Sequence, residues 1–382
     1  MIDTGIDFNH EDLRDYDQYP DKFRIWKNED EIANNGIDDD NNGFVDDVRG
    51  WNFVSNNNDI MDDCGWSHGT HSAGIIGAWT DNGIGISAVD WRAKIMVLKA
   101  LDNQTNITDS SAVRAIDYAT ENGAHISSNS YAKEIESRST TGAIARAMSA
   151  GRLFIAAAGN YSRYPWRDND LKSLYPASHD FDNIISVAYT HYSDILDEDS
   201  HYGFYSVDLA APGRLIYSTT IGNQYGDLSG TSEATPFVAG VAALVWGHRP
   251  SLNWWQVKTI IMKSVDQLSS LSGKVSSGGR LNAYKALTAP TPNLPAAPSN
   301  LNAQAFGCDV KLTWNDNSNN EDGFFIYRKT GNIFVQFDYT GPNVTTYWDV
   351  ELPPYETFCY YVRAFNQDGN SQKTLIKCAK TT

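Results

Sequence analysis

The sequence predicts an α/β domain followed by a smaller all-β domain, because the order of its apolar segments changes near residue 290. Up to residue 289, short apolar runs such as NIISVAYT at 183–190 alternate with helical patterns such as SSAVRAIDYATENGA at 110–124. This alternation favours a mostly parallel sheet with helices on both faces. The stretch 231–247 is apolar nearly all round and predicts a buried helix, with Pro236 in its first turn.

The second domain follows a segment rich in proline and alanine. Residues 290–297 predict an extended, semi-rigid linker. Beyond it, short runs of β-branched and aromatic residues are separated by Asn, Asp, Gly and Pro turns. They predict an all-β sandwich over residues 298–382, after a first domain at 1–289. The expected strands are 310–314, 324–329, 345–349, 358–366 and 371–377.

Charge and hydropathy argue against two classes of partner. The formal net charge of the 382 residues is −17 and the basic residues are scattered, which disfavours nucleic acid and anionic membranes. We expect no membrane span, since no run of about 18 apolar residues occurs. The N-terminus has no signal-peptide pattern, and Met1 stands where a strand is already under way. We therefore expect the parent sequence to extend upstream.

Three residues have the chemistry of peptide hydrolysis, which needs a nucleophile, a base and a carboxylate that orients the base. Ser232 in GTSEATP lies at the mouth of the expected buried helix, whose dipole favours developing negative charge. His68 lies in SHGTHSAG, and Asp3 in IDTG ends a strand, where open α/β sheets bind ligands. Each motif alone is weak, but the order Asp, His, Ser is one of the known orders of this triad.

IDTGID, HGTHSAG and SGTSEATPFVAG resemble the three signature blocks of the subtilase family, and the resemblance extends over about residues 1–287. It implies an endopeptidase that cleaves protein or peptide substrates through an acyl-enzyme, with Asp3, His68 and Ser232 as its triad. It identifies Asn160 as the side-chain donor of the oxyanion hole, together with the Ser232 N–H. The family usually has Gly at the position of Ala132, so the subsites are expected to differ. The residues implied to line the substrate cleft are Ser130, Tyr131, Ala132 and Gly159.

Two residues close to these motifs have separate expectations. Glu233 stands where the family commonly has Met, and its carboxylate should raise the pKa of His68. We therefore expect a more alkaline onset of activity than in Glu233→Met. His71 forms an HxxH pair with His68, but the Glu of an HExxH metal site is absent. We expect His71 to be structural.

The loop DDDNNGFVDD at 38–47 predicts a calcium site, because its first residues follow the spacing of an EF-hand loop. Arg49 holds the twelfth place instead of a bidentate Glu, so an ion would need further ligands. A solvated Asn/Asp loop is the alternative. The candidate ligands are Asp38, Asp40, Asn42 and Asp46.

A second calcium site is implied by the family resemblance alone. It would use Asp12 and Asp81, with backbone carbonyls of Trp79, Ile84 and Ile86.

The C-terminal segment resembles a fibronectin type III domain over about residues 298–381, with Trp314 and Tyr361 at core positions. Attachment to a polymer or surface and plain spacing are both open roles. Cys359 and Cys378 could pair across a turn, with Cys308 as the competing partner. One disulfide here would fit an oxidising compartment, and we expect a secreted or cell-surface protein.

A different class of function is a non-catalytic subtilase relic that serves as a binding or adhesion module. The complete triad and Asn160 speak against it. An esterase of the α/β-hydrolase type is disfavoured because no GxSxG nucleophile elbow occurs.

Overall fold

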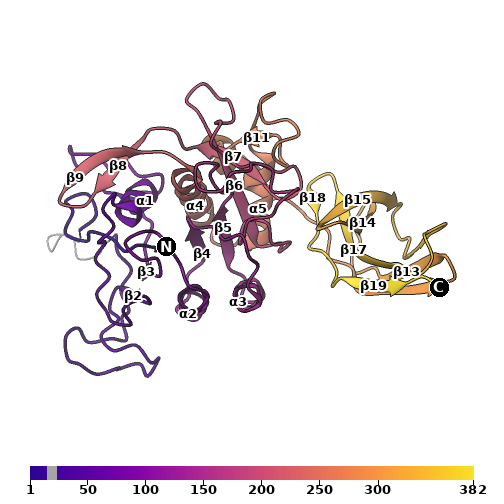
Figure 1. The fold of residues 1–382 in the computed structure, drawn as a ribbon, viewed down its shortest axis with the longest axis horizontal. Helices are drawn as coiled ribbons and strands as arrows, with labels where there is room; N and C mark the ends of the chain where they lie inside the picture. The colour runs from indigo at the N-terminus through magenta and orange to yellow at the C-terminus, as the bar shows by residue number, and fades with distance from the viewer. Residues whose placement is uncertain (15–23) are drawn as a thin grey trace. The chain divides into compact units, whose positions relative to one another are not determined.

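A nine-stranded sheet organises the first part of the chain (Figure 1). The computed structural model describes residues 1–14 and 24–382, which divide into two units, Met1–Ala289 and Pro290–Thr382. Neighbouring strands of the sheet run parallel, except for the antiparallel pair β10–β11. The predicted α/β class with a mostly parallel sheet is confirmed. In spatial order the strands are β10 (Asp266–Gln267), β11 (Gly279–Arg280), β7 (Leu209–Pro212), β6 (Ile184–Thr190), β5 (Leu153–Ala157), β4 (Ile126–Asn129), β1 (Ile2–Asp3), β3 (Val97–Lys99) and β2 (Gly50–Asn52).

Helices cover both faces of this sheet, which is why its central strands read as continuous apolar runs. Successive residues of β5 alternate between two cores: Ile155 packs in one, and Phe154 and Ala156 pack in the other. The first core includes residues of α1, α4, α5 and α6, and the second includes residues of α2 and α3, so the helices separate by face. Their bounds are α1 (His68–Gly77), α2 (Asp109–Glu121), α3 (Arg138–Ser149), α4 (Thr231–His248), α5 (Trp254–Lys263) and α6 (Ala283–Thr288).

The buried helix α4 differs from the prediction in the place of its proline. Pro236 is the sixth residue of α4, beyond the first turn. A proline there has no N–H for the carbonyl four residues earlier, which belongs to Ser232. That carbonyl instead accepts a hydrogen bond of 3.0 Å from the Ser130 hydroxyl. The lost helical bond is thereby replaced by a tertiary one.

The strand order brings the segments that follow several strands together at the carboxyl ends of these strands. β1 lies between β3 and β4, so strands from different parts of the chain end side by side. Asp3 is the last residue of β1, Ser130 directly follows β4, and Asn160 lies three residues after β5. The carboxyl ends of parallel strands at such a reversal of strand order are where α/β sheets bind ligands. A separate hairpin of β8 (Ile216–Thr220) and β9 (Gln224–Leu228) leads into α4.

The second unit consists of two antiparallel sheets around their own apolar core. Trp314, Ile326 and Val362 are among its fully or nearly fully buried residues. A disulfide joins Cys359 to Cys378, which are directly opposite on neighbouring strands, while Cys308 is exposed and free. The strands are β12 (Ser299–Phe306), β13 (Asp309–Asn315), β14 (Gly323–Thr330), β15 (Ile333–Thr340), β16 (Thr346–Asp349), β17 (Thr357–Asn366), β18 (Gly369–Asn370) and β19 (Lys377–Lys380).

The strand expected at 371–377 is wrong for most of its length, because β19 begins only at Lys377. In its place, the Ser371 hydroxyl accepts a hydrogen bond from the N–H of Ala364, and the Thr374 hydroxyl accepts one from the N–H of Val362. At these two N–H groups of β17, a side-chain oxygen accepts the hydrogen bond that a backbone carbonyl of a neighbouring strand would accept in a regular sheet. No helix of the described residues is long and apolar enough to cross a membrane.

Candidate active site

The side chains of Asp3 and His68 form a buried pair. Oδ1 of Asp3 lies 2.6 Å from Nδ1 of His68, and the two side chains are 1% and 9% exposed. Because a carboxylate accepts, the proton of a neutral imidazole lies on Nδ1, and Nε2 is left as the basic atom. Asp3 Oδ1 also accepts from the N–H of Thr4 at 2.8 Å. The pair therefore has a fixed orientation and a defined tautomer.

Ser232 lies in the same small cleft as His68, which has a volume of about 70 Å³. It is the second residue of α4, so its N–H is among the first helical N–H groups that have no partner within the helix. Its hydroxyl contacts the Ser130 carbonyl at 3.5 Å, the limit of a hydrogen bond. The Ser232 hydroxyl is therefore held only weakly in its present direction.

Asn160 has one definite orientation, because Thr231 fixes its amide oxygen. The Oδ1 atom accepts from both the N–H and the hydroxyl of Thr231, each at 3.0 Å. A backbone N–H can only donate, so the amide oxygen must face Thr231 and Nδ2 points the other way. The Thr231 hydroxyl in turn accepts from the N–H of Gly159 at 3.2 Å. Asn160 thus presents an N–H donor beside the N-terminus of α4.

Gly230 permits this arrangement. A Cβ atom at this position would lie 2.8 Å from Nδ2 of Asn160 and 3.2 Å from Oε2 of Glu233. The free amide of Asn160 and the Glu233 carboxyl therefore face the same backbone position. Any side chain here would displace one or both.

The residues expected to line the cleft lie together there, but they differ in the groups that they expose to a bound molecule. Ser130, Tyr131, Ala132 and Gly159 all line the cleft with Ser232. The Ala132 carbonyl accepts from the Tyr164 hydroxyl at 2.5 Å, so it is already occupied. Tyr131 is mostly buried and packs with the core that contains α2 and α3. On this side of the cleft, one of the two acceptor positions of the Ala132 carbonyl is thus taken, and little of Tyr131 is exposed.

The charges around His68 favour its protonated form. Burial acts to lower the pKa of His68, but the charge of Asp3 and its hydrogen bond outweigh burial. The charges of Glu233 and Asp62 act in the same direction, and the pKa is raised to about 9. Burial also raises the pKa of Glu233 to about 7, against the opposing effect of His68. The sequence prediction that Glu233 raises the pKa of His68 has a physical basis in this arrangement.

His71 and Cys64 are buried without contributing to the cleft. Nε2 of His71 donates to the Ile216 carbonyl at 2.8 Å. Burial lowers the pKa of His71 to about 4, so the ring is neutral at pH 7. This agrees with the structural role expected of it. Burial raises the pKa of the Cys64 thiol, which disfavours the reactive thiolate.

The loop at 38–47 brings together a set of acidic residues that only partly matches the predicted ligands. Carboxylate oxygens of Glu31, Asp40 and Asp47 lie within 4.8 Å of one another. Asp38 instead accepts from the N–H groups of Asn42 and Gly43, and Asp46 accepts from those of Asn35 and Gly36.

The donors to this cluster are neutral. They include Asn28, Asn42 and the Tyr118 hydroxyl, besides backbone N–H groups. Three carboxylates gathered with neutral donors form an oxygen-rich set that suits a hard divalent cation.

Asp12 organises the second predicted calcium loop by direct hydrogen bonds. Its carboxylate accepts from Asn82 Nδ2 at 2.8 Å, from the Ile86 N–H at 3.0 Å and from the Tyr225 hydroxyl at 2.9 Å. Asp12 is fully buried, whereas Asp81 is exposed in a left-handed conformation. The structure thus joins Asp12 to the neighbour of Asp81.

Sequence reasoning missed residues that act on the site through others. Thr231, which orients Asn160, could have been noticed as a hydroxyl directly before Ser232. Glu31 and Asp47 lie outside the EF-hand-like spacing and had no signal. Arg163 also lines the cleft and donates to the Thr105 hydroxyl at 2.9 Å. It adds a cationic residue to the lining of the cleft that holds the candidate nucleophile.

Comparisons with known proteins find one family. A model described as the subtilase family matches residues 1–296. Subtilisin-like protease 1 of Plasmodium vivax is 38% identical over 303 residues, which cover 75% of this chain and 46% of that protein. Thermitase of Thermoactinomyces vulgaris is 38% identical over 287 residues, which cover 75% of this chain and 87% of that protein. This chain thus spans about half the length of the Plasmodium relative.

A solved structure with a related fold is a crystal structure of a cold-adapted subtilisin-like serine proteinase. It matches with a TM-score of 0.54 and 27% sequence identity. The match covers 74% of this chain and 85% of the other.

Proposed function

Since this chain belongs to the subtilase family, we propose that it is a serine endopeptidase that hydrolyses peptide bonds of protein substrates with Asp3, His68 and Ser232. The observation that carries the proposal is the buried Asp3–His68 pair at 2.6 Å, whose His68 lines the same cleft as Ser232. The P. vivax relative and thermitase support the same activity class by sequence.

The proposed reaction gives each of these groups one role. Ser232 Oγ attacks the substrate carbonyl carbon while His68 Nε2 takes the hydroxyl proton, and Asp3 stabilises the imidazolium. The tetrahedral oxyanion receives hydrogen bonds from Nδ2 of Asn160 and the N–H of Ser232. His68 then gives its proton to the leaving amine as the acyl-enzyme forms. A water molecule, deprotonated by His68, attacks the ester and restores the free Ser232 hydroxyl.

The same proposal assigns the substrate to the cleft. Ser130, Tyr131, Ala132 and Gly159 would contact the residues on the acyl side of the scissile bond. The occupied Ala132 carbonyl argues for fewer main-chain contacts at that position. Arg163 would favour an acidic side chain among the contacted residues, since it is the one arginine or lysine among the described residues that line the cleft.

Structural calcium belongs to this proposal as well. Glu31, Asp40 and Asp47 fit a calcium ion by their oxygen donors, with Asn42 adjacent. Asp12 and Asp81 are the weaker candidates, because the described residues gather no group of three acidic side chains around them and Asp81 is exposed. Calcium would stabilise the loops, and no step of catalysis passes through it.

We further infer that the protein acts outside the cytosol and that its second unit is a fibronectin type III-like module. The Cys359–Cys378 disulfide supports an oxidising compartment. The two antiparallel sheets support the fold assignment. A role in attachment to a polymer or surface would use exposed aromatic side chains of this unit such as Phe306 and Trp348, which are 47% and 44% exposed and have ring centroids 5.4 Å apart.

Labelling with a fluorophosphonate tests the peptidase proposal, because the reagent captures a serine only when its base and oxyanion hole are in place. The wild type should be labelled, and Ser232→Ala should not. The exposed serine variant Ser193→Ala serves as a control and should label like the wild type. A folded wild type that is never labelled would refute the proposal and favour the non-catalytic relic.

A further inference from the structure

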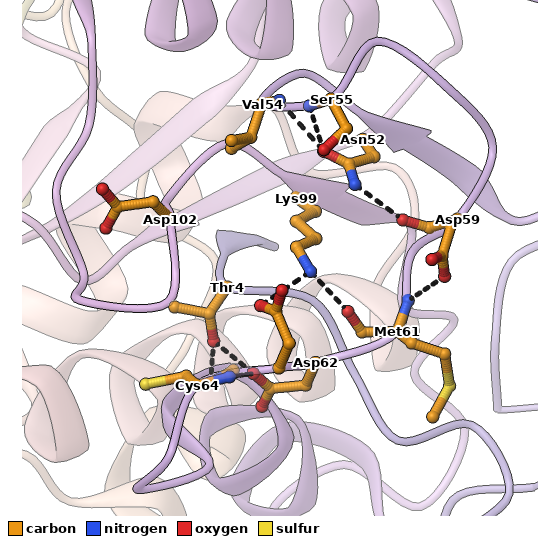
Figure 2. A network of polar contacts seen from close by, with 12 residues as sticks. Thr4, Asn52, Val54, Ser55, Asp59, Met61, Asp62, Cys64, Lys99 and Asp102 are labelled. Carbon is orange, nitrogen blue, oxygen red and sulfur yellow. Dashed lines mark hydrogen bonds and ion pairs between the residues drawn. The ribbon is translucent and has the colours of Figure 1, made fainter.

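Asp62 lies between the first strand and helix α1, and its carboxylate accepts four hydrogen bonds. Oδ1 accepts from the Thr4 hydroxyl at 2.8 Å and from the N–H of Cys64 at 3.1 Å. Oδ2 accepts from the N–H and hydroxyl of Thr70 at 2.9 and 2.7 Å. Figure 2 shows the contacts with Thr4 and Cys64. The Asp62 carboxylate is only 4% exposed, and each of its oxygens accepts two hydrogen bonds. Such a buried and fully hydrogen-bonded group restricts the positions of its partners.

The two threonines that bind Asp62 also connect the segment after β1 with the start of α1. The Thr4 hydroxyl accepts from the N–H of Gly69 in α1 at 2.9 Å. The Thr70 hydroxyl accepts from the N–H of Asp7, after the first strand, at 3.0 Å. Each hydroxyl therefore donates to Asp62 and accepts from the opposite segment. We call Thr4, Asp62 and Thr70 the clasp.

The clasp replaces a local cap at the start of α1. Ser67 occupies the N-cap position in a left-handed conformation with φ 61°, and its side chain makes no capping bond. No acidic residue lies in the first turn. The N–H groups of Gly69 and Thr70 instead bind Thr4 and Asp62. A helix N-terminus is stabilised by such acceptors and by negative charge, so Asp62 holds the helix end in place.

We propose that Asp62 is a positioning residue, which fixes Asp3 and His68 relative to each other without touching substrate. Its partners are the chain neighbours of that pair: Thr4 follows Asp3, and Gly69, which is bound to Thr4, follows His68. The inference rests on the proposed peptidase function. The backbones of the two segments also lie very close together, since a Cβ at Gly69 would lie 2.1 Å from the Gly5 carbonyl oxygen. Small displacements of one segment are therefore transmitted to the other.

The charge of Asp62 gives the inference a second readout. Together with the charges of Asp3 and Glu233, it raises the pKa of His68. Loss of this charge should therefore move the acid limb of kcat/KM to lower pH. A residue that only stabilised the fold would not produce this movement.

The test compares Asp62→Asn with the matched control Asp63→Asn. Asp63 is a neighbouring carboxylate that is 62% exposed and binds Lys99, and its amide variant still accepts that bond. We expect Asp62→Asn to lower kcat by about ten- to a hundredfold, since misplaced catalytic groups cost factors of this size. KM should change little, because the clasp does not line the cleft, and the acid limb should shift downwards. Asp63→Asn should keep the wild-type kcat and pH profile.

Thr4→Val and Thr4→Ser cover the case in which Asp62→Asn does not fold. Serine keeps the hydroxyl that joins Asp62 to Gly69, whereas valine has a similar shape and lacks it. We expect Thr4→Ser to keep kcat and Thr4→Val to lose it. Wild-type kcat in Thr4→Val, or a folded Asp62→Asn with unchanged kcat and acid limb, would overturn the inference. Wild-type protein that takes no fluorophosphonate label refutes the peptidase function itself, which is a distinguishable failure.

Discussion

Replacing Glu233 with Gln removes the carboxylate nearest in sequence to the candidate nucleophile and leaves its shape almost unchanged. Glu233 is 3% exposed, and its pKa is about 7, whereas that of His68 is about 9. Ionised Glu233 favours the imidazolium, which cannot act as a base. The variant should therefore reach its active form at lower pH than the wild type.

The size of the effect follows from the coupling between the two groups. A nearby opposite charge shifts a pKa by about 1–3 units, and Asp3 is the larger influence on His68, so we take about one unit for Glu233. Below about pH 7 the wild-type Glu233 is itself protonated, and the difference between the proteins fades. Well above pH 9 both imidazoles are neutral. The variant should thus exceed the wild type by roughly threefold in kcat/KM near pH 8, and hardly at all near pH 6.

The assay is kcat/KM for a fluorogenic peptide between pH 6 and 10, at constant ionic strength. Glu121→Gln is the control, since it removes one negative charge at the exposed end of α2 on the other face of the sheet. Its profile should match the wild type. Superimposable profiles of Glu233→Gln and wild type would show that Glu233 does not act on His68. A uniform difference at all pH values would contradict the coupling described here.

Four further changes have expected outcomes. Asn160→Ala should lower kcat by about 10²–10³-fold with little change in KM, because it removes a donor to the oxyanion, and equal kcat values in steady-state assays would contradict this role. Chelation of calcium should lower the melting temperature by several degrees, since a ligand at a hundred times its Kd contributes about 2.7 kcal/mol. Glu31→Gln should weaken that response in calorimetry, and Glu121→Gln should not. Cys359→Ser should destabilise the second unit by about 3 kcal/mol, given the sequence separation of 19 residues, and an unchanged denaturation midpoint would speak against it.

The places of some candidate site residues could be predicted from their immediate sequence. Asp3, His68 and Ser232 lie in short motifs, and the strand or helix beside each motif has a strong apolar pattern. The structure brings His68 and Asp3 into contact and places Ser232 in their cleft. The helical pattern at 110–124 likewise corresponds to α2.

Features that depend on distant partners were not predictable. Thr231 orients Asn160 across 71 positions, and although its hydroxyl stands directly before Ser232, no local pattern identifies Asn160 as its partner. Glu31 joins Asp40 and Asp47 because the loop folds back, whereas the EF-hand spacing considers only consecutive positions. The pairing of Cys359 with Cys378 required the register of β17 and β19.

In the second unit, β12 was not predicted, because few of its side chains face the core and most of those are small. Leu301 is the one residue of β12 in the buried part of the core, and Ala303 and Ala305 pack at its margin. Such an alternation gives little hydrophobic contrast.

The bonds that build the site share long sequence separations. The Asp3–His68 bond spans 65 positions, the Asn160–Thr231 bond 71 and the Ser130–Ser232 bond 102. Contacts of this kind require the closure of large loops and form late in folding. A nascent chain that has not been synthesised as far as α4 lacks the candidate nucleophile Ser232. In a longer chain, Ser232 is not aligned with His68 until the strands of the sheet have paired. If the proposed peptidase function holds, the capacity to cleave therefore arises only with the finished domain, and the half-made chain and its neighbours are protected from cleavage.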